Sequence, residues 1–312
     1  MPSDPLSEVL YLVNARCLMS GGLIAGGAWA RRFPRPDVIK FMAVAEGTCW
    51  LIMEELEAPL RLETGDVIVV NGKHQLVLTS DPTVAPPKAT TAYDHMTDGI
   101  GRLGDTREFF MLGGHVAVDP ARQDLLLDVL PPLIHVRGSS AEAAALQWLL
   151  GQLVREVQAD RPGAAVATAQ LAQLMFVQAL RAHLATSSPT AGGWLRALGD
   201  ERIAPALHLM HGDPARPWTL SELARAVAMS RTTFALRFRT VVGVAPLAYL
   251  LDWRMHLAER DLRESNKPVS ALALALGYSS ESAFSNAFKR RMGMAPKRYR
   301  TTFRSADRLA LA

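Results

Sequence analysis

The sequence predicts an α+β protein, in which a small β-barrel with helices precedes an all-α domain of two helix-turn-helix units joined by a long helix. Three observations predict this class. Short apolar runs alternate with turn residues up to about position 115, apolar residues then recur at three- and four-residue steps after position 132, and the last part of the chain matches itself at an offset of 50 residues. With 312 residues, the chain is long enough for two separate cores.

Residues 31–115 carry the strand pattern. The runs Lys40–Ala45 and Asp66–Val70 are apolar, and turn signals such as Glu46-Gly47 and Asn71-Gly72 lie between runs of this kind. Their spacing is that of a small barrel or sandwich. We therefore expect the first domain to be built from short strands.

Two amphipathic helices are expected after the strands, because apolar residues recur with helical spacing in residues 141–158 and again in residues 171–184. Their apolar stripes either cap the barrel or also form a homodimer seam, and the sequence favours the seam. The segment that follows begins with Ser, Thr, Pro and Gly residues typical of a linker.

The last part of the chain contains an internal repeat. Seven residue types recur 50 positions further on, starting from Ser230, Phe234, Phe238, Gly243, Ala245, Pro246 and Tyr249. Each copy predicts a short helix, a tight turn with a serine N-cap, a longer helix, and a Gly-x-Ala-Pro sequence that starts another helix. This arrangement is a helix-turn-helix, present twice.

Helical geometry separates two faces of the longer helix in each copy. At 100° per residue, the face opposite the two phenylalanines carries Thr232, Ala235, Leu236 and Arg239 in the first copy, and Ser282, Ser285, Asn286 and Lys289 in the second. Small and hydrogen-bonding side chains suit base edges in a major groove, and basic ones suit phosphates. The alternative interpretation is a pair of solvated helix faces.

The charge distribution favours the DNA interpretation. The formal net charge is only +4, but residues 1–213 hold 17 Lys and Arg against 23 Asp and Glu, whereas residues 214–312 hold 17 against 7. A basic second half indicates a polyanionic partner. Between the copies, Pro246 to about Arg263 predicts one helix of roughly 27 Å, and with a reading helix attached at each end this is close to the ~34 Å of one DNA turn. Leu250, Trp253 and Leu257 would be its buried face.

The residues of this domain resemble a known family. The segments Leu220–Ala224, Met229–Phe234, Phe284–Arg290 and Gly293–Arg300 resemble the DNA-binding domain of AraC/XylS-family transcription regulators, over about residues 199–302. The resemblance implies that bases are read by Thr232, Ala235, Leu236, Ser282, Ser285 and Asn286. Leu236 departs from the polar or arginine residue common there, so it would touch a thymine methyl group, or the first unit would discriminate less.

Basic residues around the two units are predicted to contact the DNA backbone, because phosphates attract cationic side chains. They are Arg231, Arg239, Arg254, Lys289, Arg290, Lys297 and Arg298.

The first part of the chain resembles the cupin-type sensory domain found in a subgroup of these regulators. The resemblance is carried by Asp4–Leu10, Glu46–Leu51, Leu62–Val67, Leu130–Leu133 and Phe176–Arg181. It implies a small β-barrel with a ligand cavity, followed by helices that dimerise. Candidates to line the cavity for a small apolar or aromatic effector are Trp29, Phe33, Phe41, Trp50 and His74, although each would equally well fill the barrel core.

A catalytic cupin would hold a metal through three or more convergent ligands. The strands offer no His-x-His pair, His74 stands alone, and His95, His115 and His135 are scattered. We therefore expect no metal, no cofactor, no catalytic residue and no enzymatic activity. Two alternatives remain open, a cupin metalloenzyme fused to a DNA-binding domain and an architectural DNA binder.

These observations predict a homodimeric, cytoplasmic transcription regulator that binds double-stranded DNA and a small-molecule effector, with RNA polymerase as a further partner and no membrane association.

Only Cys17 and Cys49 are present, which excludes a disulfide framework. The expected parts are a sensing and dimerisation domain at 1–186, a linker at 187–198, the DNA-binding domain at 199–304 and a tail at 305–312.

Overall fold

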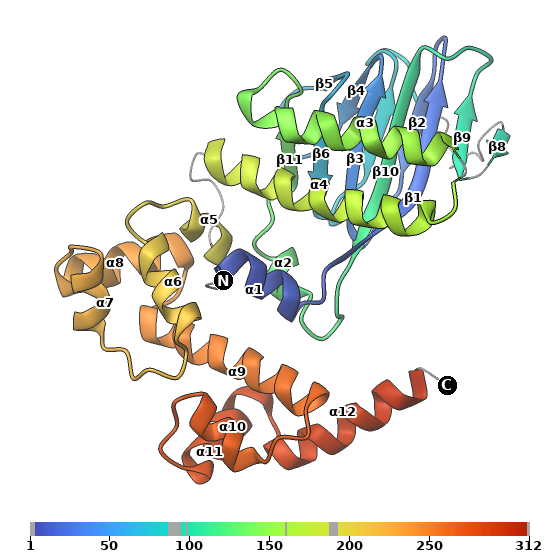
Figure 1. Cartoon of the computed structure of the whole chain (residues 1–312). Helices are drawn as coiled ribbons and strands as arrows, with labels where there is room; N and C mark the ends of the chain where they lie inside the picture. The colour runs from blue at the N-terminus through green and yellow to red at the C-terminus, as the bar shows by residue number, and fades with distance from the viewer. Residues whose placement is uncertain (1–3, 87–94, 98, 160, 187–192, 311–312) are drawn as a thin grey trace. The chain divides into compact units, whose positions relative to one another are not determined.

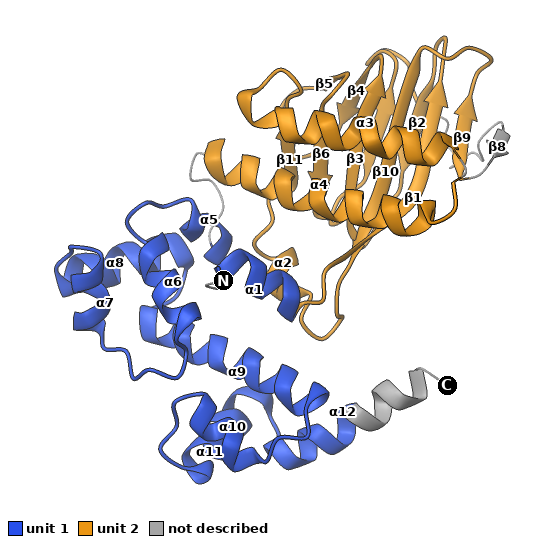
Figure 2. Cartoon of the chain, in the orientation of Figure 1, with its two compact units in different colours: residues 1–12, 192–312 blue, residues 13–191 orange. Residues whose placement is uncertain are grey.

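The computed structural model describes residues 4–86, 95–97, 99–159, 161–186 and 193–310, and the chain divides into two compact units (Figures 1 and 2). Residues 13–191 form one unit, which we call the barrel unit. Residues 1–12 and 192–312 together form the other, the helical unit.

This division differs from the predicted domain boundaries in three places. Residues 1–12 belong to the helical unit and not to the barrel. The predicted linker contains helix α5 (Trp194–Leu198), whose Ala197 is fully buried in the core of the helical unit. Residues 305–310 of the predicted tail are part of helix α12 (Pro296–Ala310), and residues 311–312 lie outside the described residues. Linker composition marked the start of the connection, but apolar residues that follow it are drawn into the helical core.

The barrel unit is built on two sheets. The larger has seven strands in the spatial order β11 (Leu133–Val136), β6 (Val67–Val70), β3 (Ile39–Glu46), β10 (Phe109–Ala117), β1 (Arg16–Ala25), β9 (Ile100–Leu103) and β8 (His95–Thr97). The smaller has the order β2 (Ala30–Phe33), β7 (Leu76–Thr79), β4 (Thr48–Ile52) and β5 (Leu60–Glu63). The predicted run at 40–45 lies in β3, and residues 67–70 of the run at 66–70 form β6, so the β-rich first domain is confirmed.

The main core of this unit lies between the two sheets. Met42 and Val44 of β3 belong to it together with Leu51 of β4 and Leu78 of β7. Because successive strand residues point to opposite faces, Phe41 is buried on the other side of the larger sheet. Both faces of β3 are therefore covered, which explains its nearly continuous apolar run.

Helices α3 (Ala144–Ala159) and α4 (Ala164–Thr186) cover that other face of the larger sheet (Figure 1). The short elements α2 (Asp124–Leu127) and η1 (Ala141–Ala143) precede them. Helix α4 contacts β1, β6 and β11, and the Gln173 side-chain oxygen accepts a hydrogen bond of 2.9 Å from the Cys17 N–H. Both predicted helices are confirmed, and Leu146, Leu149 and Leu153, which lie within the predicted amphipathic segment at 141–158, are buried.

The helical unit consists of helices in its described residues. Besides α5 and α12 they are α1 (Pro5–Leu12), α6 (Ala204–Gly212), α7 (Leu220–Ala226), α8 (Arg231–Val242), α9 (Pro246–Glu264), α10 (Val269–Ala275) and α11 (Glu281–Met292). Helix α1 contacts α5, α6 and α9. Among the described helices, no single one is long and apolar enough to cross a membrane; only α8 and α9, taken together as a bent pair, meet the criteria of length and composition.

Two apolar cores organise the helical unit, and α9 belongs to both. Leu250, near its start, packs with Phe234 and Phe238 of α8. Met255 and Leu262, further along, pack in the second core, which contains the phenylalanines of α11. The predicted connector, expected over 246–263, is thus a 19-residue helix that carries one helix-turn-helix unit at each end.

Candidate nucleic-acid interface and barrel cavity

The two helix-turn-helix units have the same start and stop signals. The Ser230 hydroxyl accepts a hydrogen bond of 3.2 Å from the Thr233 N–H at the start of α8, and the Ser280 hydroxyl accepts one of 3.1 Å from Ala283 at the start of α11. Left-handed glycines end both helices, with φ of 93° at Gly243 and 76° at Gly293. Since a side chain at positive φ is strained, the repeated glycines fix where each helix stops.

The cores beneath the two helices are also duplicated. In each, the two phenylalanine ring centroids lie 5.7 Å apart. A tyrosine from the following helix packs edge-on, Tyr249 at 5.8 Å from Phe238 and Tyr299 at 5.4 Å from Phe288. The inward face of each helix is therefore fixed, and the opposite face must point outward.

The predicted base-reading residues lie on these outward faces. Thr232 and Leu236 on α8 are exposed, and Ala235 is half-buried. The second unit shows the same pattern, since Ser282 and Asn286 on α11 are exposed and Ser285 is half-buried. Leu236 is a large apolar residue, yet it is 68% exposed. Arg239 on α8 and Lys289 on α11 are exposed further along the same faces.

Most of the predicted backbone-contacting residues point to solvent. Arg231, Arg290 and Arg298 are exposed. Lys297 is also exposed, and its Nζ lies 3.8 Å from the Glu281 carboxylate. Arg254 is different, because its Nε donates to the Pro214 carbonyl at 2.6 Å and its Nη2 to the Arg216 carbonyl at 2.8 Å. Burial lowers the Arg254 pKa from its ordinary value. A phosphate contact from Arg254 would therefore have to use its Nη1 or the second N–H of its Nη2.

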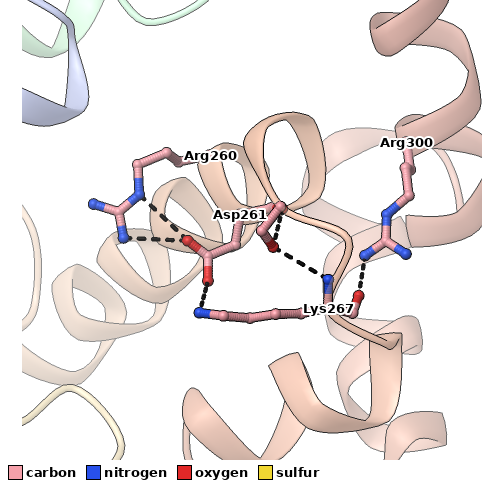
Figure 3. Close-up of polar contacts among 5 residues, drawn as sticks. Arg260, Asp261, Lys267 and Arg300 are labelled. Carbon is pink, nitrogen blue, oxygen red and sulfur yellow. Dashed lines mark hydrogen bonds and ion pairs between the residues drawn. The ribbon is translucent and has the colours of Figure 1, made fainter.

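Other basic side chains of the helical unit are used internally. At the end of α9, the Asp261 carboxylate accepts hydrogen bonds from Arg260, at 3.2 Å, and from the Lys267 Nζ, at 3.1 Å (Figure 3). Arg300 on α12 donates to the Lys267 carbonyl at 2.5 Å. This network joins α9, the loop before α10, and α12. Part of the positive charge counted in the sequence thus holds the second unit together.

Sequence reasoning did not single out Arg225. This exposed residue lines a shallow hollow at the turn between α7 and α8, together with Ser221, Met229 and Arg231. Its place just before the turn of the first repeat is the signal that could have identified it. The hollow adds a second arginine beside the start of α8, where helix N-termini favour anions.

The barrel unit contains a cavity of about 560 Å³ between its two sheets. Inward-facing residues of the larger sheet form its apolar wall together with Phe33 and Leu76 of the smaller one. Phe41 also borders the cavity, although its ring lies on the other face of β3. Trp29 is instead buried in the core, with its ring 5.2 Å from that of Phe109.

Two other candidate ligand residues do not line this cavity. Trp50 is half-buried on β4, and His74 lies in a turn and pairs with Glu55. Of the five candidates, Phe33 and Phe41 thus border the cavity, but the Phe41 ring lies on the other face of the larger sheet.

Three polar side chains that sequence reasoning did not assign also line the cavity. Lys40 and His115 lie directly opposite each other in the antiparallel pairing of β3 and β10. The Ser20 Oγ lies between them, accepting from the Lys40 Nζ at 3.3 Å and hydrogen-bonded to the His115 Nδ1 at 3.0 Å. The available signal was strand parity, since Lys40 shares its face with the core residues Met42 and Val44.

Within the described residues, no three His, Cys, Asp or Glu side chains gather closely enough to hold a metal ion. Cys17 and Cys49 are free and buried, and burial raises the pKa of both thiols to about 12.

Comparisons with known proteins agree with this architecture. Residues 4–185 match a family described as Cupin, and residues 223–302 match one described as Helix-turn-helix domain. A putative AraC-like transcription regulator of Streptomyces lividans is 43% identical over 298 residues, covering 95% of this chain and 98% of the relative. One from Streptomyces antibioticus is 41% identical over 297 residues, covering 95% and 98%.

Among solved structures, the DNA-binding domain of AdpA in complex with a target DNA is 31% identical and covers 34% of this chain and 95% of that one, with a TM-score of 0.33. Full-length relatives at more than 40% identity, together with the two matched domains, decide the family. The chain belongs to the AraC-like transcription regulators, with a cupin N-terminal domain and a DNA-binding helix-turn-helix region.

Proposed function

We propose that this regulator reads two successive major grooves with the outward faces of α8 and α11, and that a small molecule in the barrel cavity modulates its promoter binding. The observation that carries the proposal is the duplicated, exposed face held on a shared helix. With 19 residues, α9 is roughly 28 Å long, which suits two reading helices one DNA turn apart.

The base contacts are assigned to the six outward residues, Thr232, Ala235, Leu236, Ser282, Ser285 and Asn286. Asn286 has the amide that pairs with adenine, and the exposed Leu236 suits a thymine methyl group. The flanking cations are assigned to phosphates, which gives affinity without sequence preference. They are Arg231, Arg239, Arg254, Lys289, Arg290, Lys297 and Arg298.

The regulator would act as a homodimer in the cytoplasm and pass its signal to RNA polymerase. Exposed apolar side chains on the two barrel helices support a dimer surface: Trp148 on α3 is 62% exposed, and Val166 and Leu174 on α4 are 68% and 43% exposed. Exposed apolar groups gathered on adjacent helices favour association. Each protomer would then bring its own pair of reading helices to the promoter.

The DNA proposal is tested with two variants on a site selected from random DNA. Asn286→Ala should relax the preference at one base position at a cost of about 1–3 kcal/mol. Lys289→Ala should weaken binding to all sequences and reduce the slope of log affinity against log salt by about one. Lys73→Ala is the matched control, an exposed lysine of the barrel unit paired with Asp128. If both variants behave like this control in gel shifts, the assigned outward faces do not contact DNA.

The effector proposal is tested by repeating the selected-site titration with a metabolite panel. A compound that binds the barrel unit and changes the DNA dissociation constant supports it. Compounds that bind without changing DNA affinity would contradict it.

A further inference from the structure

We infer that the barrel cavity recognises a small organic anion, with Lys40, Ser20 and His115 binding its charged group and the apolar wall holding its body. This rests on the proposed effector role of the cavity and adds the chemical class of the ligand. It differs from the apolar effector expected from the aromatic candidates alone.

The first argument is the charge of the cavity wall. The titratable side chains among its described lining residues are Lys40, His115 and Arg35, and none of the described lining residues is an Asp or Glu. Arg35 is paired with Asp37 at 2.6 Å, outside the wall. The described residues give Lys40 a serine partner and no carboxylate. Among the described residues, the half-buried ammonium therefore has no counter-ion, and a bound anion would supply one.

The second argument is hydrogen-bonding capacity. An ammonium group carries three donors, and Lys40 uses one of them on the Ser20 hydroxyl. That hydroxyl also shares a hydrogen bond with His115. Burial lowers the pKa of Lys40, and burial and then the charge of Lys40 lower the pKa of His115. The cluster is thus a set of donors at the edge of a low-polarity space, where a carboxylate would be bound strongly.

The third argument is the shape of the rest of the wall. Along β10 the inward positions run from His115 through Gly113 to Met111, so the backbone between the polar cluster and the apolar wall carries no side chain. Leu23, Met42 and Leu76 continue the apolar surface. One charged end and one apolar body on the same ligand would therefore meet matching surfaces.

The test uses two pairs of probes with the same body and a different head group: 2-naphthoate with 2-naphthamide, and octanoate with octanamide. Calorimetric titration of the full chain should show at least one anion binding at least about tenfold more tightly than its neutral partner. Lys40→Met should remove that preference and leave the amide affinity within about twofold. Lys40→Arg should retain it, which separates charge from folding.

Lys73→Met, which changes an exposed lysine that does not line the cavity, should match the wild type. Equal binding of acid and amide, unchanged anion affinity in Lys40→Met, or no anion binding at millimolar concentration would each overturn the inference. The proposed function fails separately: if an anion binds through Lys40 but leaves DNA affinity unchanged, the site is correct and its regulatory role is not.

Discussion

Ala228 and Gly277 occupy the same place in the two helix-turn-helix turns, 49 positions apart, and both have positive φ, of 52° and 79°. In both turns the next residue donates its N–H to an equivalent carbonyl, that of Ala224 or Ala273. An alanine in this conformation costs roughly 1 kcal/mol that a glycine does not. The first turn is therefore strained and the second is not.

Ala228→Gly should raise the free energy of unfolding by roughly 0.5–1 kcal/mol, because Ala228 is exposed and loses little packing. Gly277→Ala should lower it by about 2 kcal/mol or more, since a Cβ there would lie 2.0 Å from the Ala215 carbonyl oxygen. Urea unfolding of both variants checks the pair. Equal effects of the two substitutions on the free energy of unfolding would contradict the strain assigned to Ala228.

At the residue scale, the repeat allowed prediction of the N-caps Ser230 and Ser280, because a cap is a local signal. Trp50 and His74 could not be placed in the same way. Whether an aromatic residue such as Trp50 lines a cavity or points away from it depends on strand register. His74 pairs with Glu55, which comes from another part of the chain. The only local sign of a role for Lys40 was a charged residue in an otherwise apolar run.

Helix α1 belongs to the helical unit, although sequence reasoning placed it in the first domain and the cupin family match includes it. Its Glu8 accepts a hydrogen bond of 3.0 Å from the Nδ1 of His211 on α6, and the His211 Nε2 accepts one of 2.7 Å from the Tyr249 hydroxyl. One neutral tautomer satisfies both bonds. The imidazole also stacks on Trp253, with ring centroids 4.0 Å apart. Pairing between elements some 200 positions apart leaves no local signal.

The His211 contact predicts a pH dependence. Burial lowers the pKa of His211, although Glu8 and Asp4 act in the opposite direction and His208 adds to the lowering. The unfolded chain therefore takes up a proton near pH 6.5 that the folded chain does not, so stability is lost as pH falls below that value.

The loss from His211 should be at most about 1.4 kcal/mol per pH unit. His115 and His183 also have lowered pKa values, so the difference between wild type and His211→Gln isolates this residue. Urea titrations at several pH values between 7.5 and 5 measure it. Identical pH slopes for the two proteins would show that His211 is not the group responsible.

At the scale of the whole molecule, the order of domains was predictable and their boundaries were not. Period, repeat and charge each change near a boundary, which is why the α+β class and the doubled helix-turn-helix followed from the sequence. Sequence reasoning did not predict helix α5, because this helix is short and follows linker-like residues. Its Trp194, Leu195 and Ala197 are buried, so packing and not composition decides where the helical unit begins.

The position of α1 predicts that residues 193–312 alone form a weakened unit. Leu6, Val9 and Leu10 are buried on α1, which packs against α5, α6 and α9. Without it, their apolar partners are exposed to water, at a cost on the order of a few kcal/mol. Adding a peptide of residues 4–12 should raise the melting temperature of that fragment, and a peptide with Leu6 and Val9 changed to serine should not. Equal shifts from both peptides would contradict specific docking.

Since the helical unit takes its first helix from the start of the chain, the barrel unit is, topologically, an insertion within it. Recombination that exchanges sensory domains between relatives would have to break the chain twice, near residues 12 and 191, to leave the helical unit whole. A single crossover near residue 190 would import a foreign first helix. Chimeric regulators should therefore function best when residue 8 and residue 211 come from the same parent.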